Sequence, residues 1–292
     1  MIEIRQAETD ADLNAWLAVR RAVLPNERTA SLDELKTSIK PGDLHLLAEL
    51  EGELAGSGLA NRSDTGNAHL APRVLPDKRG RGVGIALLER LGAHAVGQGY
   101  TRAGSHVAGD DEGSLAFAQR FGFEELRRDV QQVLEVKSVR PRELEEVDFV
   151  SIEERPDLLE AAYPIAREGY EDMPIEGLDI PLEGWLTEEA TLAAGSLAAL
   201  ADGEVVGYAG LLNWADEPTK AEHGLTVVRR DWRRRGLASA LKERQIAWAA
   251  ANGIRQLVTY TQTGNENMQS VNARLGYVTT DVTVAFTRSL PL

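Results

Sequence analysis

Residues 228–240 read VRRDWRRRGLASA: the end of an apolar strand, a basic turn, a glycine and the start of an amphipathic helix. The N-terminus of a helix leaves its first N–H groups unpaired and carries a partial positive charge, so it attracts anionic oxygens. Gly236 permits a tight turn close to a ligand, while Arg233, Arg234 and Arg235 add cationic donors. The stretch therefore predicts a pocket for a pyrophosphate.

The same pattern occurs 154 residues earlier. Residues 74–123 align with residues 228–277 without a gap. Identical pairs include Asp77/Asp231, Arg79/Arg233, Arg81/Arg235, Gly82/Gly236, Glu89/Glu243, Arg90/Arg244, Gly122/Gly276 and, just upstream, His69/His223. A register held over this length indicates a duplicated domain rather than a short solenoid repeat. We predict one domain over residues 1–140 and a second over residues 146–292, joined near Pro141.

The bulk composition narrows the class of protein. The chain has 292 residues, 43% hydrophobic content, a formal net charge of −14 and no cysteine. Two domains of this size can each bury a core, and a negative chain is a poor binder of nucleic acid or anionic membrane. Without cysteine there is no thiol nucleophile or thiolate metal site, and we expect no metal. Neither a long apolar run nor a signal-peptide pattern occurs, so we expect a soluble, cytoplasmic protein.

Periodicity and turn residues predict an α+β fold in each half, with helices on both faces of a sheet. In the first half we expect strands at 1–7, 44–50, 54–61, 68–75, 100–107 and 123–136, and helices at 10–24, 31–41, 83–96 and 112–121. In the second half we expect strands at 148–152, 196–201, 204–214, 221–228, 254–261 and 278–288, the last closing that half's sheet, and helices at 157–170, 236–251 and 265–275.

Three local signals sharpen this assignment. Glu51-Gly52 and Asp202-Gly203 should turn two hairpins, and Ser31 with Glu34 should form a capping box. Asp10 or Asp12 should cap the first helix. Residues 169–185 are long for an ordinary connection, and we weigh a disordered surface loop against a loop that covers a substrate, because Tyr170, Met173 and Trp185 lie along it.

The central helices of the two halves open with Arg79-x-x-Gly82-x-Gly84 and Arg233-x-x-Gly236-x-Ala238. With this layout and these motifs, both halves resemble the GNAT superfamily of acyl-CoA-dependent N-acyltransferases. The segment from Asn265 to the Leu-Gly-Tyr at 275–277 is similar to a later signature of that family. The tandem arrangement resembles the two-domain actinobacterial type that includes mycothiol synthase.

The resemblance implies a mixed, mostly antiparallel sheet whose fourth and fifth strands splay apart, with acetyl-CoA as co-substrate. Thr226, Val227 and Val228 would flank the pantetheine, with free backbone N–H groups of the splayed strand holding the oxyanion. The pyrophosphate would lie on Arg233, Arg234, Arg235, Gly236, Leu237, Ala238 and Ser239, with Asn265 nearby. A second cradle would comprise Val74, Arg79, Gly80, Arg81, Gly82, Val83 and Gly84.

The resemblance also implies the catalytic candidates. A glutamate at the position of Glu222 often serves as base in this family, and the first half has Ala68 there. His223 is the rival base, but neighbouring strand residues face opposite sides unless a bulge intervenes. Because His69 repeats His223, we favour a shared structural role for both histidines.

The family's acid is missing from both halves. A tyrosine commonly protonates the leaving thiolate, but this chain has Ala118 and Asn272 at the matching positions. Asn272 can donate a hydrogen bond to sulfur or substrate but cannot act as an acid. Three alternatives remain for the leaving thiolate: protonation by Tyr260, protonation by water, or departure without an acid.

We therefore expect an acyl-CoA-dependent N-acyltransferase that acetylates the amine of a small molecule, as a monomer or homodimer, with its working site in the second half. The alternative is a non-catalytic acyl-CoA-binding or regulatory module. A Rossmann-type dinucleotide enzyme is disfavoured, because the glycines fall as Gly80-x-Gly82-x-Gly84, which is the wrong spacing.

Overall fold

The computed structural model describes residues 1–173 and 175–292; Pro174, within the loop predicted over residues 169–185, lies outside the described residues. The chain divides into two compact units. The first comprises Met1–Arg128 together with Thr283–Leu292, and the second comprises Asp129–Val282.

The first unit contains a mixed sheet with the strand order β1-β2-β3-β4-β5-β12. Neighbouring strands are antiparallel except for β4 and β5, which are parallel. Its elements are β1 (Ile2–Gln6), α1 (Asp10–Val23), α2 (Leu32–Ser38), β2 (Leu44–Leu50), β3 (Glu53–Arg62), β4 (Ala68–Val74), the short η1 (Pro76–Lys78), α3 (Val83–Gly97), β5 (Arg102–Ala108), α4 (Glu112–Arg120), the start of β6 (Glu124–Glu135) and most of β12 (Val278–Ser289).

The second unit repeats this architecture with the strand order β6-β11-β10-β9-β8-β7, and only β10 and β11 are parallel. Its further elements are β7 (Asp148–Ser151), α5 (Asp157–Glu171), α6 (Leu182–Glu188), η2 (Ala193–Gly195), β8 (Leu197–Ala201), β9 (Glu204–Asn213), β10 (Lys220–Val228), η3 (Arg230–Trp232), α7 (Leu237–Ala251), β11 (Gln256–Gln262) and α8 (Glu266–Leu275). The predicted α+β class, with a mostly antiparallel sheet in each half, is confirmed.

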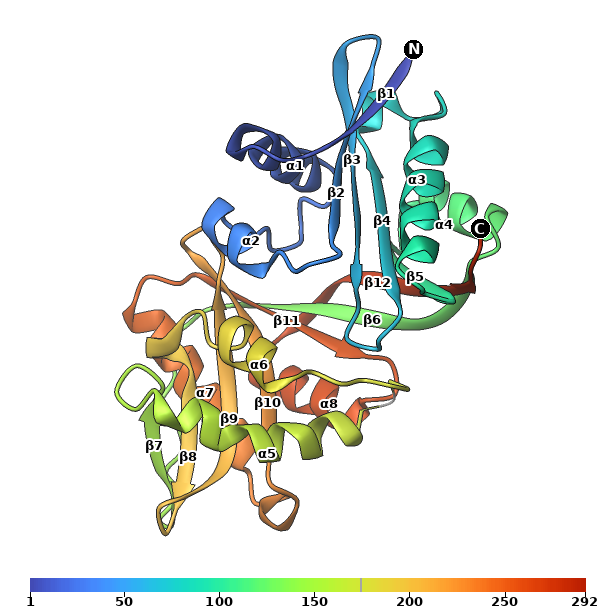
Figure 1. Ribbon diagram of the computed structural model, residues 1–292. Helices are drawn as coiled ribbons and strands as arrows, with labels where there is room; N and C mark the ends of the chain where they lie inside the picture. The colour runs from blue at the N-terminus through green and yellow to red at the C-terminus, as the bar shows by residue number, and fades with distance from the viewer. Residues whose placement is uncertain (174) are drawn as a thin grey trace. The chain divides into compact units, whose positions relative to one another are not determined.

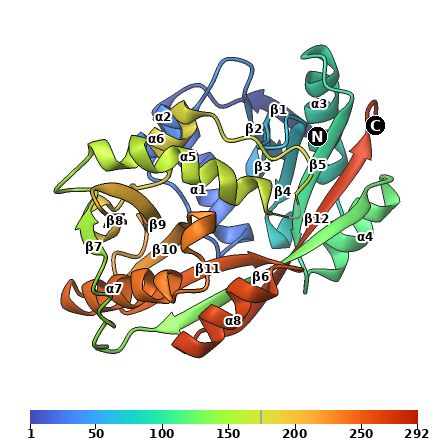
Figure 2. The ribbon, with the colours of Figure 1, turned by 90° about the horizontal axis from the view of Figure 1, so that it is seen from below.

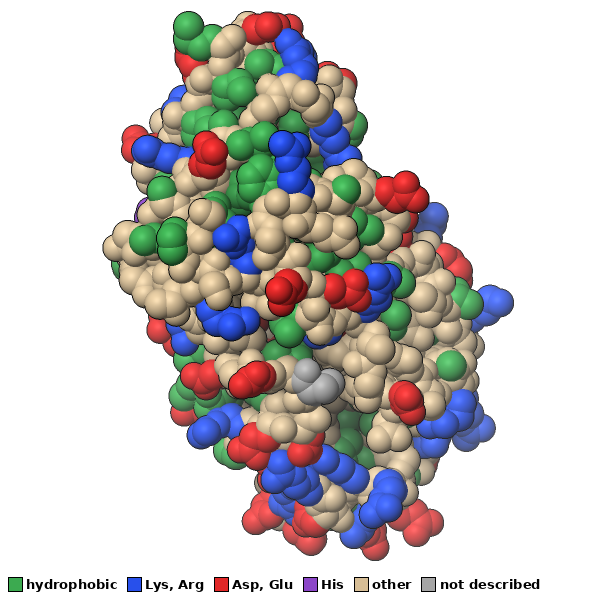
Figure 3. Space-filling model, turned by 90° about the vertical axis from the view of Figure 1, so that its right-hand side faces the viewer, with side chains coloured by type: hydrophobic (Ala, Val, Ile, Leu, Met, Phe, Trp, Pro, Cys, Tyr) green, Lys and Arg blue, Asp and Glu red, His purple; other side chains and the backbone are tan. Residues whose placement is uncertain are grey.

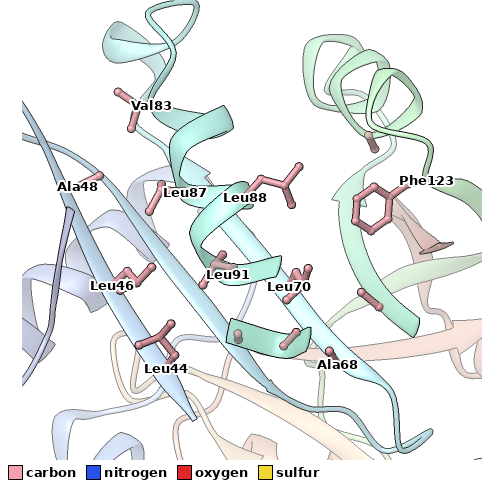
Figure 4. Packing of buried hydrophobic residues seen from close by; sticks show 14 of the residues in the cluster. Leu44, Leu46, Ala48, Ala68, Leu70, Val83, Leu87, Leu88, Leu91 and Phe123 are labelled. Carbon is pink, nitrogen blue, oxygen red and sulfur yellow. The ribbon is translucent and has the colours of Figure 1, made fainter. Parts of the chain in front are cut away.

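Helices cover both faces of the first sheet: α1 and α2 lie on one face and α3 and α4 on the other (Figure 1). Val83, Leu87 and Leu91, which the sequence places on one face of α3, are all buried. In the close view of this core, Leu91 lies between Leu46 of β2 and Leu70 of β4, and Val83 lies at the start of the helix, toward Ala48 (Figure 4). Burial of each such side chain contributes roughly 1.5–3 kcal/mol, so this face holds α3 on the sheet.

In the second unit, α5 lies on one side of β10 and β11, and α7 and α8 lie on the other (Figure 2). The core beneath α5 includes Tyr170 and Trp185, and the Trp185 indole N–H donates to the Leu159 carbonyl at 2.7 Å. The stretch 169–185 is thus shorter as a loop than the sequence predicts, because Tyr170 belongs to α5 and Trp185 to α6. The rings of these two aromatic residues serve the core rather than a cover over a substrate.

The predicted turns and caps are confirmed except at α1. Both hairpin turns place a non-glycine and a glycine at positive φ, Glu51 (59°) with Gly52 (84°) and Asp202 (51°) with Gly203 (80°). Helix α1 is capped by Thr9, not by Asp10 or Asp12. Asp12 is the third helical residue, and its carboxylate accepts from the Thr9 N–H in a capping box that the sequence analysis missed.

The last strand of each half belongs to the other half's sheet. Residues Thr283–Ser289 of β12 pair with β5 in the first unit, and residues Asp129–Glu135 of β6 pair with β11 in the second. The expectation that residues 278–288 close the second half's own sheet is wrong for residues 283–288, which pair with β5. The two pairings share one register, since Arg102↔Ser289 and Gln256↔Glu135 coincide after a shift of 154. The arrangement is that of a strand exchange within one chain, in which β6 and β12 each occupy the place beside the other copy's strand.

Candidate functional site

Strands β10 and β11 run together only at their start. They pair from Lys220↔Gln256 to Glu222↔Val258, and beyond this point β10 stays with β9 alone. The register of β10 against β9 shifts between His223 and Thr226, which marks a β-bulge. The predicted splay is confirmed in both units, because β4 and β5 also pair only at Ala68 and His69.

A pocket of about 560 Å³ opens in the second unit. It is formed by the end of α5, the second half of β10, the start of α7 and the start of α8. All the cradle residues predicted in the second half, Arg235 excepted, line this pocket: Thr226, Val227, Val228, Arg233, Arg234, Gly236, Leu237, Ala238, Ser239 and Asn265. Met173 of the predicted loop also lines it.

The start of α7 supplies a cradle for anionic oxygens. Gly236 precedes the helix with φ of 83°, a left-handed conformation that glycine adopts without strain, and Arg234 lies at φ of 62°. No side chain caps the helix, so its first N–H groups face the pocket with their partial positive charge uncompensated. The local geometry is the one that binds phosphate oxygens.

The arginines around this cradle differ in their contacts. Arg233 pairs with Asp172 at 2.5 Å, and Arg230 pairs with the same carboxylate at 2.9 Å. These two guanidinium groups lower the pKa of Asp172, Arg230 contributing most. The Arg235 side chain instead packs over the Trp232 ring, 4.7 Å from its centroid. A phosphate that enters the pocket would displace the Asp172 carboxylate and pair with Arg233 in its place.

Glu222 and His223 face opposite sides of β10. The His223 imidazole lies in the core on the α7 side, where Nε2 contacts the Tyr277 hydroxyl at 2.5 Å. Burial, and then the charge of Lys242, lowers the pKa of His223 well below its ordinary value. Glu222 is therefore the residue of this pair on the α5 side, where its charge acts on another carboxylate, that of Glu189.

Sequence reasoning missed Glu189. This residue is the C-cap of α6, directly after Glu188, and its carboxylate accepts the Leu225 N–H from the bulge of β10 at 2.6 Å. Gly210 and Gly224 make space for this carboxylate, because a β-carbon added at either position would collide with Glu189 Oε1. The one available signal was the pair of glycines inside two strands, which marks close approach of another group but does not say which.

The family profile of the acetyltransferase (GNAT) family matches residues 8–123 and 157–277. The chain belongs to the GNAT family. The two matched segments correspond to the two copies of the duplicated sequence. An acetyltransferase of Sodalis glossinidius is 32% identical over 82 residues, which is 28% of this chain and 58% of that protein.

Solved structures share the tandem GNAT fold. A GCN5-related N-acetyltransferase from Sphaerobacter thermophilus superposes with a TM-score of 0.78 at 19% identity, over 99% of this chain and 95% of that one. A tandem GNAT protein from the clavulanic acid biosynthesis pathway gives a TM-score of 0.77 at 19% identity, with both chains covered completely. At these identities the similarity establishes the fold alone.

The first GNAT copy builds the same turn but with different partners. Gly80 and Gly82 have φ of 74° and 90° before α3. The predicted residues of this turn are Val74, Arg79, Gly80, Arg81, Gly82, Val83 and Gly84. Arg79 pairs with Asp111 at 2.9 Å and Arg81 with Glu51 at 2.9 Å, so protein carboxylates already hold both cations.

Strand β4 of the first copy also lacks the bulge of β10. Its pairing with β3 runs in one register from Ala68 to Val74, all of which are described. Pro72 stands at the position of Thr226 and has no N–H to offer. This copy therefore presents fewer backbone donors where the resemblance places the thioester.

The two histidines do not share a role. His69 pairs with Gly104 of β5, and Glu222 pairs with Val258 of β11, the residue 154 positions after Gly104. His69 thus occupies the place of Glu222, because the bulge shifts β10 by one residue. Burial, followed by the neighbouring His106, lowers the pKa of His69 to about 3.

Asn272 does not line the pocket. It is fully buried on α8, and its amide Nδ2 donates to Gln132 Oε1 at 2.9 Å. The Tyr260 hydroxyl, considered as a substitute acid, accepts from the Gln131 amide at 2.7 Å. Neither placement supports a role at the thioester, since both side chains are engaged with β6.

Within residues 1–173 and 175–292 there is no cluster of metal-binding side chains and no helix long and apolar enough to cross a membrane. On the face shown in Figure 3, Lys and Arg side chains are interspersed with Asp and Glu side chains.

Proposed function

We propose that this GNAT protein transfers an acyl group from an acyl-CoA, most simply acetyl from acetyl-CoA, to the amine of a small molecule by direct attack. The observation that supports the proposal is the convergence of three features on one pocket of the second unit. These are a splayed and bulged strand, an uncapped helix start with a left-handed glycine, and an arginine that a phosphate can recruit.

Each pocket residue would have a role set by its position along the bound acyl-CoA. Thr226, Val227 and Val228 would flank the pantetheine arm, and residues 233–239 would hold the pyrophosphate, with Asn265 at the pocket's α8 side. Backbone N–H groups at the bulge would bind the developing oxyanion, an effect worth about 3 kcal/mol for each donor. Glu222 would take a proton from the attacking amine.

The experiment compares wild type with Gly236→Glu and Gly82→Glu. Both glycines precede a helix at positive φ, so both substitutions impose similar backbone strain. We expect Gly236→Glu to reduce acetyl-CoA affinity at least about 100-fold, because a carboxylate at the helix start repels the diphosphate. Calorimetric titration with acetyl-CoA, and thiol release on incubation with a panel of primary amines, measure binding and transfer.

Gly82→Glu is the matched control and should keep both binding and transfer at the second unit. Retained affinity in Gly236→Glu would refute the placement of the pyrophosphate. Acetyl-CoA binding by the wild type with no amine-dependent thiol release across the panel would favour the alternative function, an acyl-CoA-binding module without turnover.

A further inference from the structure

The Glu189 carboxylate accepts a hydrogen bond from the Leu225 N–H, a backbone donor that the proposed transfer reaction needs for its oxyanion. Of the bulge residues, Leu225 lines the pocket, and its N–H points to Glu189 Oε1 at 2.6 Å. A carboxylate oxygen and a thioester carbonyl oxygen are acceptors of similar size. The carboxylate therefore stands where a polarised carbonyl oxygen would accept the same hydrogen bond.

The surrounding structure is built to hold this carboxylate. Trp185, buried in the core, anchors α6, and Glu189 is the next residue after that helix. Gly210 on β9 and Gly224 on β10 lie against Glu189 Oε1, so the room for the carboxylate depends on the absence of two side chains. In the first copy, Leu59 stands at the position of Gly210 by strand pairing, and its side chain would fill that room.

The titratable groups facing Glu189 come from three elements. Burial is the main cause that raises the pKa of Glu189 to about 8; the Leu225 N–H lowers this pKa, and the charge of Glu222 on β10 raises it. Tyr208 on β9 borders the same space, and the charge of Tyr170 on α5 acts on Tyr208. A carboxyl group that titrates near working pH can both accept and return a proton.

We propose that Glu189 is the second proton-transferring residue of the site. It holds the Leu225 N–H in the free protein, yields that N–H to the thioester carbonyl, and then carries a proton from the amine to the leaving sulfur. The inference rests on the proposed acyl transfer. It accounts for the absence of the family's tyrosine, because one carboxyl group acts as base first and as acid afterwards.

The protons and bonds balance with two carboxylates. Glu189 takes one proton from the ammonium group of the acceptor, and the nitrogen lone pair forms the N–C bond as the carbonyl π pair moves onto oxygen at the Leu225 N–H. Glu222 takes the second proton from nitrogen. As the C=O bond re-forms and the C–S bond breaks, Glu189 returns its proton to sulfur, and Glu222 later releases its proton to water.

The kinetic test follows kcat from pH 6 to pH 10 with acetyl-CoA and the amine that gives the fastest thiol release. In the wild type we expect kcat to rise through an apparent pKa near 8. Glu189→Gln should lower kcat about 100-fold or more, change the KM for acetyl-CoA less than about threefold, and remove that ionisation. Glu188→Gln removes the same charge from the exposed neighbouring residue and should leave kcat within about twofold of wild type.

A spectroscopic test needs no acceptor. With [15N]leucine labelling, the Leu225 amide resonance, identified by its loss in Leu225→Met, should titrate near pH 8 in the wild type and not in Glu189→Gln. In Glu222→Gln the inflection should move to lower pH, because a charge that raises the pKa of Glu189 is gone.

The two proposals fail in different ways. A wild type that neither binds acetyl-CoA nor releases thiol would overturn the proposed function. A wild type that turns over, while Glu189→Gln retains full kcat and the same pH profile, would overturn the role of Glu189 alone. So would a Leu225 amide that shows no inflection between pH 6 and pH 10.

Discussion

Lys242 is a buried cation whose counterpart in the first copy is apolar. It is 1% exposed on α7, and Nζ lies 5.3 Å from the centroid of the Tyr277 ring. Burial lowers the pKa of Lys242 to about 7. Leu88, at the same position of α3, is 2% exposed. The first copy therefore has an apolar leucine at the position where the second copy buries an ammonium group, which is costly to remove from water.

We predict that Lys242→Leu stabilises the protein. The folded pKa lies below the unfolded value of 10.5, so the folded state loses its proton first and wild-type stability rises as pH increases from about 7 to 10.5. At pH 7 the variant should gain roughly 2–4 kcal/mol in the free energy of unfolding, and its stability should be flatter over that pH range. Urea unfolding at pH 7 and pH 9.5 measures both, and equal stabilities at pH 7 would contradict the prediction.

At this scale, sequence predicted what is local. The turn from Arg233 to Ala238 lies in consecutive residues, so its chemistry could be recognised in advance. Glu189 reaches Leu225 only because α6 docks through Trp185, and no spacing in the sequence encodes that contact. Asn272 was misplaced for the same reason: its burial against β6 is set by tertiary packing.

At the scale of elements, α4 and α8 show how one cap can serve two purposes. Asn265 caps α8 by accepting the Met268 N–H, and Asp111 caps α4 by accepting the Ser114 N–H. Only Asp111 carries a charge, and it pairs with Arg79. The aspartate therefore holds Arg79, whereas the uncharged Asn265 adds no second carboxylate to the pocket, where Asp172 already pairs with Arg233.

We predict that Asn265→Asp separates capping from binding. Asparagine and aspartate are comparable N-caps, so the free energy of unfolding should stay within about 0.5 kcal/mol. Acetyl-CoA affinity should fall about tenfold, because a carboxylate at the pocket repels the diphosphate. Thermal unfolding and calorimetry measure the two effects; Asp111→Asn in the first unit is the control and should not alter affinity at the second. An Asn265→Asp protein with wild-type affinity would refute the argument.

The boundaries of helices and strands were largely predictable, because capping boxes, glycine turns and apolar periodicity depend on residues that are close together in the sequence. The bulge of β10 was not, since nothing in residues 223–226 distinguishes a bulge from a regular strand. Its effect is large for its size: one extra residue places Glu222, rather than His223, where His69 lies in the first copy.

At the scale of the whole molecule, the exchange of β6 and β12 binds the two halves of the sequence into each other's sheets. The two exchanged pairings share one register, so sequence patterns could predict both strands but not their partners. The sequence boundary between residues 140 and 146 consequently differs from the compact units, in which Thr283–Leu292 belongs with Met1–Arg128.

We predict that residues 1–140 and residues 146–292, expressed as separate chains, do not form native monomers. The first would lack the strand that pairs with β5, and the second would lack the strand that pairs with β11. Mixing the two should restore amide protection on β5 and β11 in hydrogen exchange. Full protection in either fragment alone, as a monomer by light scattering, would contradict the prediction.

The exchanged strand also governs the order in which the protein can mature during its synthesis. Residues 1–128 emerge from the ribosome long before residues 283–289 have been translated. During that interval the edge of β5 that later pairs with β12 can pair with strands of other chains. A nascent chain of this kind depends on rapid completion, or on a chaperone that shields the waiting edge until its own distant segment arrives.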